Sequence, residues 1–273
     1  METHIQTTHG MFALNAHTDA KMAARLAEET FPQQETLDLI EALGAKRVVD
    51  VGAHIGTVSI PLAKLGKNVV AFEPSPESFK YLIRNAELNG VTIDARNKGL
   101  ADTPGRAHSV ARQSGNAGAH TLEAGDEIKV STLDAEIQDA DFIKIDVEGM
   151  ELAVLKGGQA LLERSRPAVY FEVNLTALRA RRTLLASLAK FFRAHRYRFY
   201  FCADHVLYEL PGLTPAALLV TPRSMLFGGP SALFDVLALA AESRAPYPAR
   251  SRMHAMLYLL TRYVKLQYAR FFH

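Results

Sequence analysis

The chain has 273 residues, of which 48% are hydrophobic and 22% are charged, a composition typical of globular proteins. Its net charge of +2 gives no reason to expect nucleic-acid binding, and a single cysteine, Cys202, excludes an internal disulfide and a cysteine-rich zinc site. No apolar run approaches the roughly 20 residues that cross a bilayer, and no leader pattern opens the chain. These observations predict a cytoplasmic protein.

The N-terminal part shows little periodicity. Residues 1–31 predict a loose lead-in with a short helix at 20–29, and residues 30–44 predict a helix that ends at Gly44. We place a large α/β domain at residues 32–212 and a C-terminal extension at residues 213–273.

Residues 47–74 have the pattern of a strand, a helix and a second strand. The first β-branched run ends at Gly52, and a second apolar run ends on Glu73. Because Gly52 and Gly56 lack side chains where the first strand turns into the helix, a nucleoside can lie against bare backbone. Glu73 is then placed to accept hydrogen bonds from both hydroxyls of a ribose.

The glycine spacing distinguishes between nucleosides. A dinucleotide site requires G-x-G-x-x-G, whereas Gly52 and Gly56 are separated by three residues, as G-x-x-x-G, which weakens the dinucleotide interpretation. Asp50, two residues before the first glycine, suits a ligand with a cationic end, such as the sulfonium and ammonium of S-adenosylmethionine. The glycines taken alone are equally typical of an ordinary strand-to-helix turn.

The next elements are expected to border the adenosine. Residues 74–90 predict a helix and residues 91–100 a third strand, after which Asp102 either accepts a hydrogen bond from the adenine amino group or opens a turn. Residues 105–130 predict a β-hairpin above the cofactor. Its residues Ser114 and Asn116 lie either nearest the adenosine or at a solvated tip.

Carboxylates follow the strand predicted at residues 141–145. Asp146 and Glu148 share a side if that strand continues, and Glu151 comes next. Because acids also favour a helix start, Glu148 or Glu151 either caps the helix at 150–163 or belongs to the site, and Asp146 is the better functional candidate. Two acids without a third ligand do not make a metal site, so no metal is predicted.

The sheet is expected to end with antiparallel strands. Residues 167–173 predict a buried strand that ends near Glu172, whose charge lies either beside the pocket or in a salt bridge. A basic helix at 178–195 and a hairpin at 197–210 follow. The fold predicted is therefore α/β, with a mostly parallel sheet and an antiparallel final strand.

The C-terminal tail is basic and amphipathic. No acid follows Glu242, and residues 253–271 predict a helix with one apolar face. Such a helix docks on its own domain or on a second subunit as a homodimer, or makes peripheral contact with a membrane surface. All three alternatives stay open.

Several of these stretches together resemble one family. The runs VVDVGAHIGTVSIPLA, VVAFEPSPESFKYLIRNAELNG, TLDAEI, DFIKIDVEGMELAVLKGG and RPAVYFEVN occur in the order typical of the FkbM family of S-adenosylmethionine-dependent methyltransferases. The resemblance implies a Rossmann-like class I methyltransferase fold and methylation, typically at oxygen, of sugars or natural-product intermediates. One position departs from the family, which usually has Asn where this chain has His54.

The expected chemistry is methyl transfer to a hydroxyl of a small-molecule or glycan acceptor. The catalytic base is expected to be Asp146 or Glu172, with His54 as a third candidate. The cofactor-binding residues are expected to be Asp50, Gly52, Ala53, His54, Gly56, Glu73, Pro74, Asp102, Ser114, Asn116 and Asp146. Two alternatives remain, an NAD(P)-dependent oxidoreductase and a non-catalytic adenosine-binding protein.

Overall fold

The computed structural model describes residues 2–111, 120–125, 127–174, 185–203, 206–210 and 233–250. The chain divides into two compact units, Met1–Arg166 and Pro167–His273. The domain bounds at residues 31 and 212 stay a prediction.

The first unit contains a parallel sheet in the order β10, β3, β4, β5. These strands are β3 (Arg47–Val51), β4 (Asn68–Phe72), β5 (Asp94–Arg96) and β10 (Phe142–Ile145). Their β-branched and aromatic side chains are almost completely buried, as expected of a parallel sheet covered on both faces. Strand order reverses beside β3, because β4 follows on one side and β10 on the other. In open α/β sheets such a switch point is where ligands bind, outside the carboxyl ends of the strands.

Helices connect and cover these strands. They are α1 (Ala20–Leu26), α2 (Gln34–Ala42), α3 (Ser59–Lys64), α4 (Pro76–Leu88), α5 (Leu133–Glu136), α6 (Glu151–Lys156) and α7 (Gln159–Ser165). Helix α4 begins where Ser75 caps it by accepting from the N–H of Ser78, with Pro76 in the first turn. Gly157 and Gly158 divide the helix expected at residues 150–163 into α6 and α7. At Gly157 a Cβ would collide with the Ala101 carbonyl.

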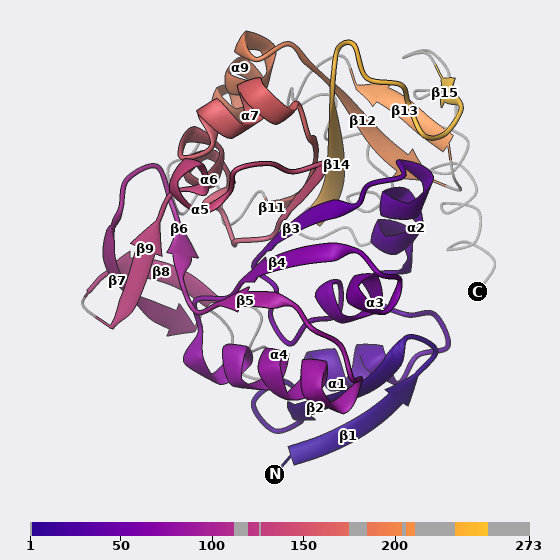
Figure 1. Cartoon of the computed structure of the whole chain (residues 1–273), viewed down its shortest axis with the longest axis vertical. Helices are drawn as coiled ribbons and strands as arrows, with labels where there is room; N and C mark the ends of the chain where they lie inside the picture. Colours follow the sequence, from indigo (N-terminus) through magenta and orange to yellow (C-terminus); the bar gives the residue numbers. More distant parts are fainter. Residues whose placement is uncertain are drawn as a thin grey trace, which may run out of the picture. The chain divides into compact units, whose positions relative to one another are not determined.

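The interpretation of the first residues as a loose lead-in was wrong. Residues 2–15 form an antiparallel hairpin of β1 (Glu2–Thr7) and β2 (Gly10–Asn15), and Phe12, Ala13 and Leu14 are completely buried. The hairpin lies beside α4 (Figure 1). Its β2 strand was missed because β1 pairs with only one edge of it, while side chains of the α4 region bind the other edge.

Two asparagines one turn apart, Asn85 on α4 and Asn89 at its C-cap, make that attachment. Asn85 accepts from the Ala13 N–H at 2.6 Å and donates to the Ala13 carbonyl at 3.1 Å. Asn89 accepts from the Met11 N–H at 3.0 Å and donates to the Met11 carbonyl at 2.7 Å. Asn85 also donates to the Ile55 carbonyl at 2.8 Å. The hairpin is therefore tied both to α4 and to the loop that follows β3.

The single strand expected at residues 91–100 is divided between two sheets. Strand β5 belongs to the parallel sheet, whereas β6 (Gly99–Leu100) joins a four-stranded sheet in the order β6, β9, β7, β8. The other strands are β7 (Gly105–Ala111), β8 (His120–Ala124) and β9 (Ile128–Ser131). The expected hairpin is confirmed, because β7 and β8 pair antiparallel.

The second unit is a mainly antiparallel arrangement. Its elements are β11 (Ala168–Asn174), α9 (Leu185–Ala194), β12 (Tyr197–Ala203), β13 (Val206–Leu210), β14 (Leu233–Ala240) and β15 (Ala249–Arg250). The expected pairing of β12 with β13 is confirmed. Strand β14 was missed, and it pairs antiparallel with both β11 and β12. The predicted C-terminal helix lies outside the described residues.

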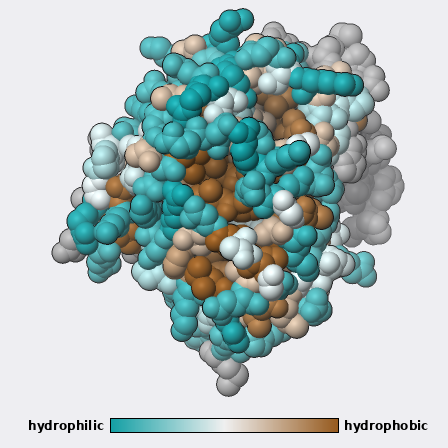
Figure 2. All heavy atoms as spheres, in the orientation of Figure 1, coloured by the Kyte–Doolittle hydropathy of each residue, from teal (hydrophilic) through white to brown (hydrophobic). Residues whose placement is uncertain are grey.

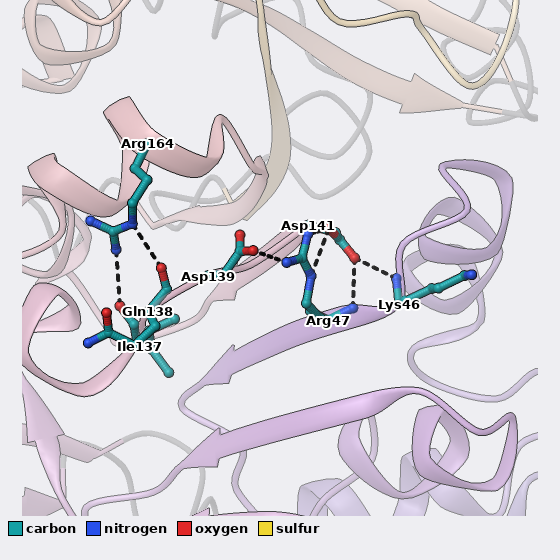
Figure 3. A network of polar contacts seen from close by, with 7 residues as sticks. All are labelled: Lys46, Arg47, Ile137, Gln138, Asp139, Asp141 and Arg164. Atoms are coloured by element: carbon teal, nitrogen blue, oxygen red, sulfur yellow. Dashed lines mark hydrogen bonds and ion pairs between the residues drawn. The ribbon is translucent and has the colours of Figure 1, made fainter.

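A charged clamp joins β3 and β10 at the ends opposite the switch-point loops (Figure 3). The Arg47 guanidinium contacts Asp139 and Asp141, and Asp141 also accepts from the backbone N–H of Lys46 and Arg47 at 2.9 and 2.8 Å. Partial burial opposes ionisation of Asp141, but these hydrogen bonds outweigh it and lower its pKa to about 2. The clamp therefore fixes the register of the two strands whose other ends form the switch point.

The surface view shows hydrophobic residues in patches among hydrophilic ones (Figure 2). Two large apolar side chains of the first unit, Leu65 and Ile83, are exposed. Within the described part of the chain, no helix combines the length and the apolar character needed to span a bilayer.

Candidate functional site

The loop after β3 has an unusual backbone. Gly52, His54 and Gly56 have φ of +83°, +53° and +93°, in the region that favours glycine. The N–H groups of Gly52 and Ala53 both donate to the Phe72 carbonyl at the end of β4, at 2.9 and 3.0 Å. The loop is thus held at the carboxyl ends of two neighbouring strands.

The structure gives a different reason for the two glycines than the one expected. A Cβ at Gly52 would collide with the Asp146 carbonyl oxygen, and a Cβ at Gly56 would lie 2.8 Å from side-chain atoms of Ile60 and Leu82. Both glycines are therefore required by protein packing as well as by φ. The contact at Gly52 brings the end of β3 against the end of β10.

Glu73 is bound to this loop through both carboxylate oxygens. One oxygen accepts from the His54 N–H at 2.8 Å and the other from the Ser75 N–H at 2.8 Å. The residue is 6% exposed. Burial raises its pKa, against the opposing effects of His54 and of the two N–H donors. The expected partners of Glu73, ribose hydroxyls, would use the remaining lone pairs of the same oxygens.

The His54 side chain meets a residue that the sequence had not indicated. Its Nε2 lies 3.0 Å from Oδ2 of Asp19, and both residues are buried. Asp19 precedes α1 in the capping position but makes no side-chain hydrogen bond to that helix. The two side chains are close without being aligned as a hydrogen bond.

Asp50 is enclosed by protein groups. It is completely buried, its Oδ2 accepts from the Ser59 hydroxyl at 2.7 Å, and its Oδ1 lies 3.6 Å from Nζ of Lys144. Lys144 is the cross-strand neighbour of Asp50 on β10, and its Nζ is also 3.4 Å from Oδ2 of Asp146. Lys144 thus connects the two acidic residues at the switch point.

The segment after β10 turns instead of continuing as a strand. Strand β10 ends at Ile145, and Glu148 and Gly149 have φ of +52° and +96°. The strand therefore does not continue, and the condition under which Asp146 and Glu148 would share a side is not met. Asp146 lies directly after β10, where its N–H donates to the Val51 carbonyl at 2.9 Å. Its side chain is 36% exposed.

Glu151 is the buried acid of this turn. It is 1% exposed, its Oε1 accepts from the Gly149 N–H at 2.9 Å, and its Oε2 has no hydrogen-bond partner among the described residues. Burial, assisted by the charges of Asp146 and Glu148, raises its pKa to about 7. Capping by a side chain, expected from Glu148 or Glu151, is not observed at the N-cap of α6, which is Met150.

The remaining predicted residues lie in other places. Pro74 is half-buried beside Glu73, and its carbonyl accepts from Asn97 at 3.2 Å. Asp102 is exposed in the bend after β6. Ser114 and Asn116 lie outside the described residues. Glu172 belongs to the second unit, opposite Asp235 in the pairing of β11 with β14. The structure therefore gathers Asp50, Gly52, Ala53, His54, Gly56, Glu73, Pro74 and Asp146 at one edge of the first unit's sheet.

The side chains of this edge suit a donor-rich, cationic ligand. Glu73 and Asp146 are hydrogen-bond acceptors, and acids outnumber the lysine that lies between Asp50 and Asp146. S-adenosylmethionine carries a sulfonium, an ammonium and two ribose hydroxyls that donate. The residues present fit this group.

A family model decides the class of protein. The model of the Methyltransferase FkbM domain matches residues 50–199, more than half of the chain. The chain belongs to the FkbM methyltransferase family. This membership confirms the predicted family and with it the Rossmann-like methyltransferase fold, and it confirms S-adenosylmethionine as the cofactor class. It favours the methyltransferase over the oxidoreductase alternative.

Individual proteins and solved structures are similar to this chain to different extents. The hexuronic acid methyltransferase AglP of Haloferax volcanii is 30% identical over 115 residues, which are 40% of this chain and 48% of AglP. A crystal structure of a methyltransferase FkbM from Methylobacillus flagellatus is 24% identical, with 47% of this chain and 32% of that chain covered and a TM-score of 0.35. The Pyrococcus abyssi tRNA (uracil-54, C5)-methyltransferase is 14% identical, with 88% and 44% covered and a TM-score of 0.45. The chain spans about half or less of the length of the curated relatives it matches.

Two residues of this site, Asp19 and Lys144, were missed from sequence, and a third, Glu151, was expected to cap a helix. Lys144 had a signal, because it is a lysine within the apolar run Phe142–Ile145 that precedes Asp146. Asp19 had none, since its role depends on burial, and Glu151 was recognised as an acid of this segment but not as its buried one. A hydrophilic lead-in and a helix start are where exposed acids are expected.

Proposed function

We propose that the protein transfers a methyl group from S-adenosylmethionine to a hydroxyl oxygen of a sugar, a glycan or a natural-product intermediate. The observation that supports this most directly is the joining of the Gly52–Gly56 loop to Glu73 and Asp146 at the switch point of the parallel sheet. Oxygen as the accepting atom follows the family resemblance and the sugar-acid substrate in the name of the relative AglP.

The residues at this edge of the first unit's sheet have different roles in the proposal. Bound S-adenosylmethionine supplies the methyl group on a sulfonium. Glu73 binds the ribose hydroxyls, and the Gly52–Gly56 backbone lies against the adenosyl part. The acids near Asp50 favour the cationic end. Such contacts hold donor and acceptor in line, which contributes a large part of the rate in group transfer.

Asp146 accepts the proton of the acceptor hydroxyl as the new oxygen–carbon bond forms. Its side chain is 36% exposed at the mouth, whereas His54 is buried and already paired with Asp19. Glu172 stays a second candidate for this role. The acceptor is a small molecule or glycan rather than a nucleic acid, and a cytoplasmic location is part of the same proposal. For the helix predicted at residues 253–271 the proposal keeps three alternatives, namely docking on its own domain, a homodimer or a peripheral membrane contact.

Labelled S-adenosylmethionine tests the activity. The purified protein is incubated with the labelled donor and an extract of its source cell, and the product that gains the label is identified. We expect a methyl ether on a small molecule or glycan. Methylation at nitrogen or carbon, or label on RNA, contradicts the proposed acceptor, and absence of transfer with retained cofactor binding supports a non-catalytic adenosine-binding protein.

The variant Asp146→Asn tests the base. It keeps the shape of the side chain and is expected to lower kcat about 100-fold or more while S-adenosylhomocysteine still binds. Asp134→Asn is a control, since Asp134 accepts from the N–H groups of Ala160 and Leu161 at the start of α7. Full turnover by Asp146→Asn removes Asp146 from the proposal and leaves Glu172.

A further inference from the structure

The pair of Asp19 and His54 is not explained by binding of the cofactor alone. Asp19 is 2% exposed, and neither of its carboxylate oxygens has an aligned hydrogen bond among the described residues. It stands in the N-cap position of α1, where an aspartate ordinarily accepts from the helix N–H groups, and it makes no such bond. An unpaired carboxylate at this depth is costly, so a cation beside it is required for it to stay ionised.

His54 is the group placed to supply that cation. Its Nε2 lies 3.0 Å from Asp19 Oδ2, and its own backbone N–H donates to Glu73 at 2.8 Å. One residue therefore contacts two buried acids, one through the imidazole and one through the peptide. The positive φ of His54 points its backbone at Glu73 while the side chain reaches Asp19.

The surroundings of Glu73 show why a cation there matters. Glu73 is buried, and Asp50 at the end of β3 opposes its ionisation further. Lys144 on β10 lies 3.6 Å from Asp50 and 3.4 Å from Asp146, so its charge is already shared by two acids. Asp19 reaches the site from the start of α1. Of these groups, protonated His54 is the one that both contacts Glu73 and favours its charged form.

We propose that Asp19 and His54 form a charged pair that keeps the buried Glu73 carboxylate ionised, so that the loop binds the ribose of the cofactor at lower pH than Glu73 would allow alone. In this pair Asp19 holds the proton on His54, and His54 acts on Glu73. Both are positioning residues. The inference rests on the proposed function, because it assigns Glu73 to the ribose.

His54→Asn is the variant that tests the pair. Asparagine tolerates positive φ and keeps the backbone N–H that Glu73 accepts, so the variant removes the imidazole and little else. Calorimetry measures the Kd of S-adenosylhomocysteine for wild type and variant from pH 5 to 8. We expect similar affinity at pH 8 and about tenfold weaker binding by the variant near pH 6. The reason is that the pH below which acid weakens binding is about one unit higher in the variant.

His4→Asn is the matched control. His4 also lies beside an acid, 2.9 Å from Glu2, but both side chains are exposed on the hairpin. This variant is expected to leave the pH profile of binding unchanged. If the His54→Asn profile coincides with that of wild type, or if its affinity falls equally at every pH, the pair does not act on Glu73 and the inference is overturned.

A measurement on the wild-type protein is independent of any variant's stability. The ¹⁵N shifts of the His54 imidazole, assigned by comparison with His54→Asn, are expected to show both ring nitrogens protonated at pH 6 in the protein without ligand. A neutral imidazole at that pH overturns the charged pair. Failure of the wild type to bind S-adenosylhomocysteine at any pH contradicts the proposed function instead.

Discussion

Residues with positive φ mark the places where this protein sets backbone against backbone. At Gly52 the φ of +83° and the closeness of the Asp146 carbonyl act together, whereas at Gly44 the φ is +66° and nothing lies within 4 Å of a built Cβ. Comparing substitutions at Gly52 and Gly44 therefore separates the cost of conformational strain from the cost of steric collision. His54 and Glu148 also have positive φ, and because they carry side chains this conformation is strained.

Gly52→Ala is predicted to destabilise the protein by about 3 kcal/mol or more, since strain and collision add. Gly44→Ala carries strain alone and is predicted to cost about 1 kcal/mol. Urea unfolding of both variants measures the difference. Equal losses would show that β3 and β10 separate at little cost, in which case the contact between Gly52 and Asp146 does not hold the switch point together.

Single residues also show what sequence can and cannot reveal about the site. Gly52, Gly56 and Glu73 were predicted because their types and spacing follow from a strand, a turn and a second strand. Asp19 was not, because its partner is 35 positions away and only burial distinguishes it from an ordinary helix start. The packing contacts at Gly52 and Gly56 could not be predicted from the sequence either, because they depend on which atoms of the folded protein lie next to each glycine.

Elements of the parallel sheet were predictable, and elements bound in other ways were not. Strands β3, β4 and β10 are largely apolar, with Asp50 and Lys144 as internal exceptions, which is typical of strands buried on both faces. Strand β2 pairs with β1 on one edge and with asparagine side chains on the other, an arrangement without a periodic signal. Strand β14 is placed between β11 and β12 from a position much later in the chain, which no local pattern could indicate.

Asn85→Ala tests the attachment of the hairpin. The variant leaves the Ala13 N–H and the carbonyls of Ala13 and Ile55 without their partner in a buried place, so a loss of about 3 kcal/mol is predicted. Amide exchange at Ala13 is expected to become faster. Asn89→Ala is the comparison, with about 1 kcal/mol, because water reaches its half-buried site. A smaller effect from Asn85 than from Asn89 would contradict this ranking.

The folded protein buries several acidic side chains, and burial disfavours the charged form that these groups have in water at neutral pH. Glu151 is the clearest case, with a pKa near 7 in the folded protein against 4.5 for an ordinary glutamate. Between these values the folded protein holds a proton that the unfolded chain has lost. Its contribution to stability is therefore present at low pH and is lost as the pH rises through 4.5 to 7.

Glu151→Gln is predicted to remove this part of the pH dependence while its amide oxygen still accepts from Gly149. Above pH 7 the variant is expected to be more stable than wild type by about 2 to 3 kcal/mol, and below pH 4.5 the two are expected to be similar. Denaturant unfolding across pH 4 to 8 measures the difference. Glu163→Gln, at an exposed glutamate of α7, serves as the control with a constant offset. A constant offset for Glu151→Gln would contradict the assigned pKa.

The attachment of β2 through the main chain of Met11 and Ala13 has an evolutionary consequence. A bond to a peptide group is indifferent to which amino acid carries that group, so substitutions along the strand can accumulate as long as Asn85 and Asn89 persist. The FkbM match begins at residue 50, after the hairpin. Homologues with unrecognisable N-termini are therefore expected to keep this strand, and the two asparagines on α4 are the positions by which to find it.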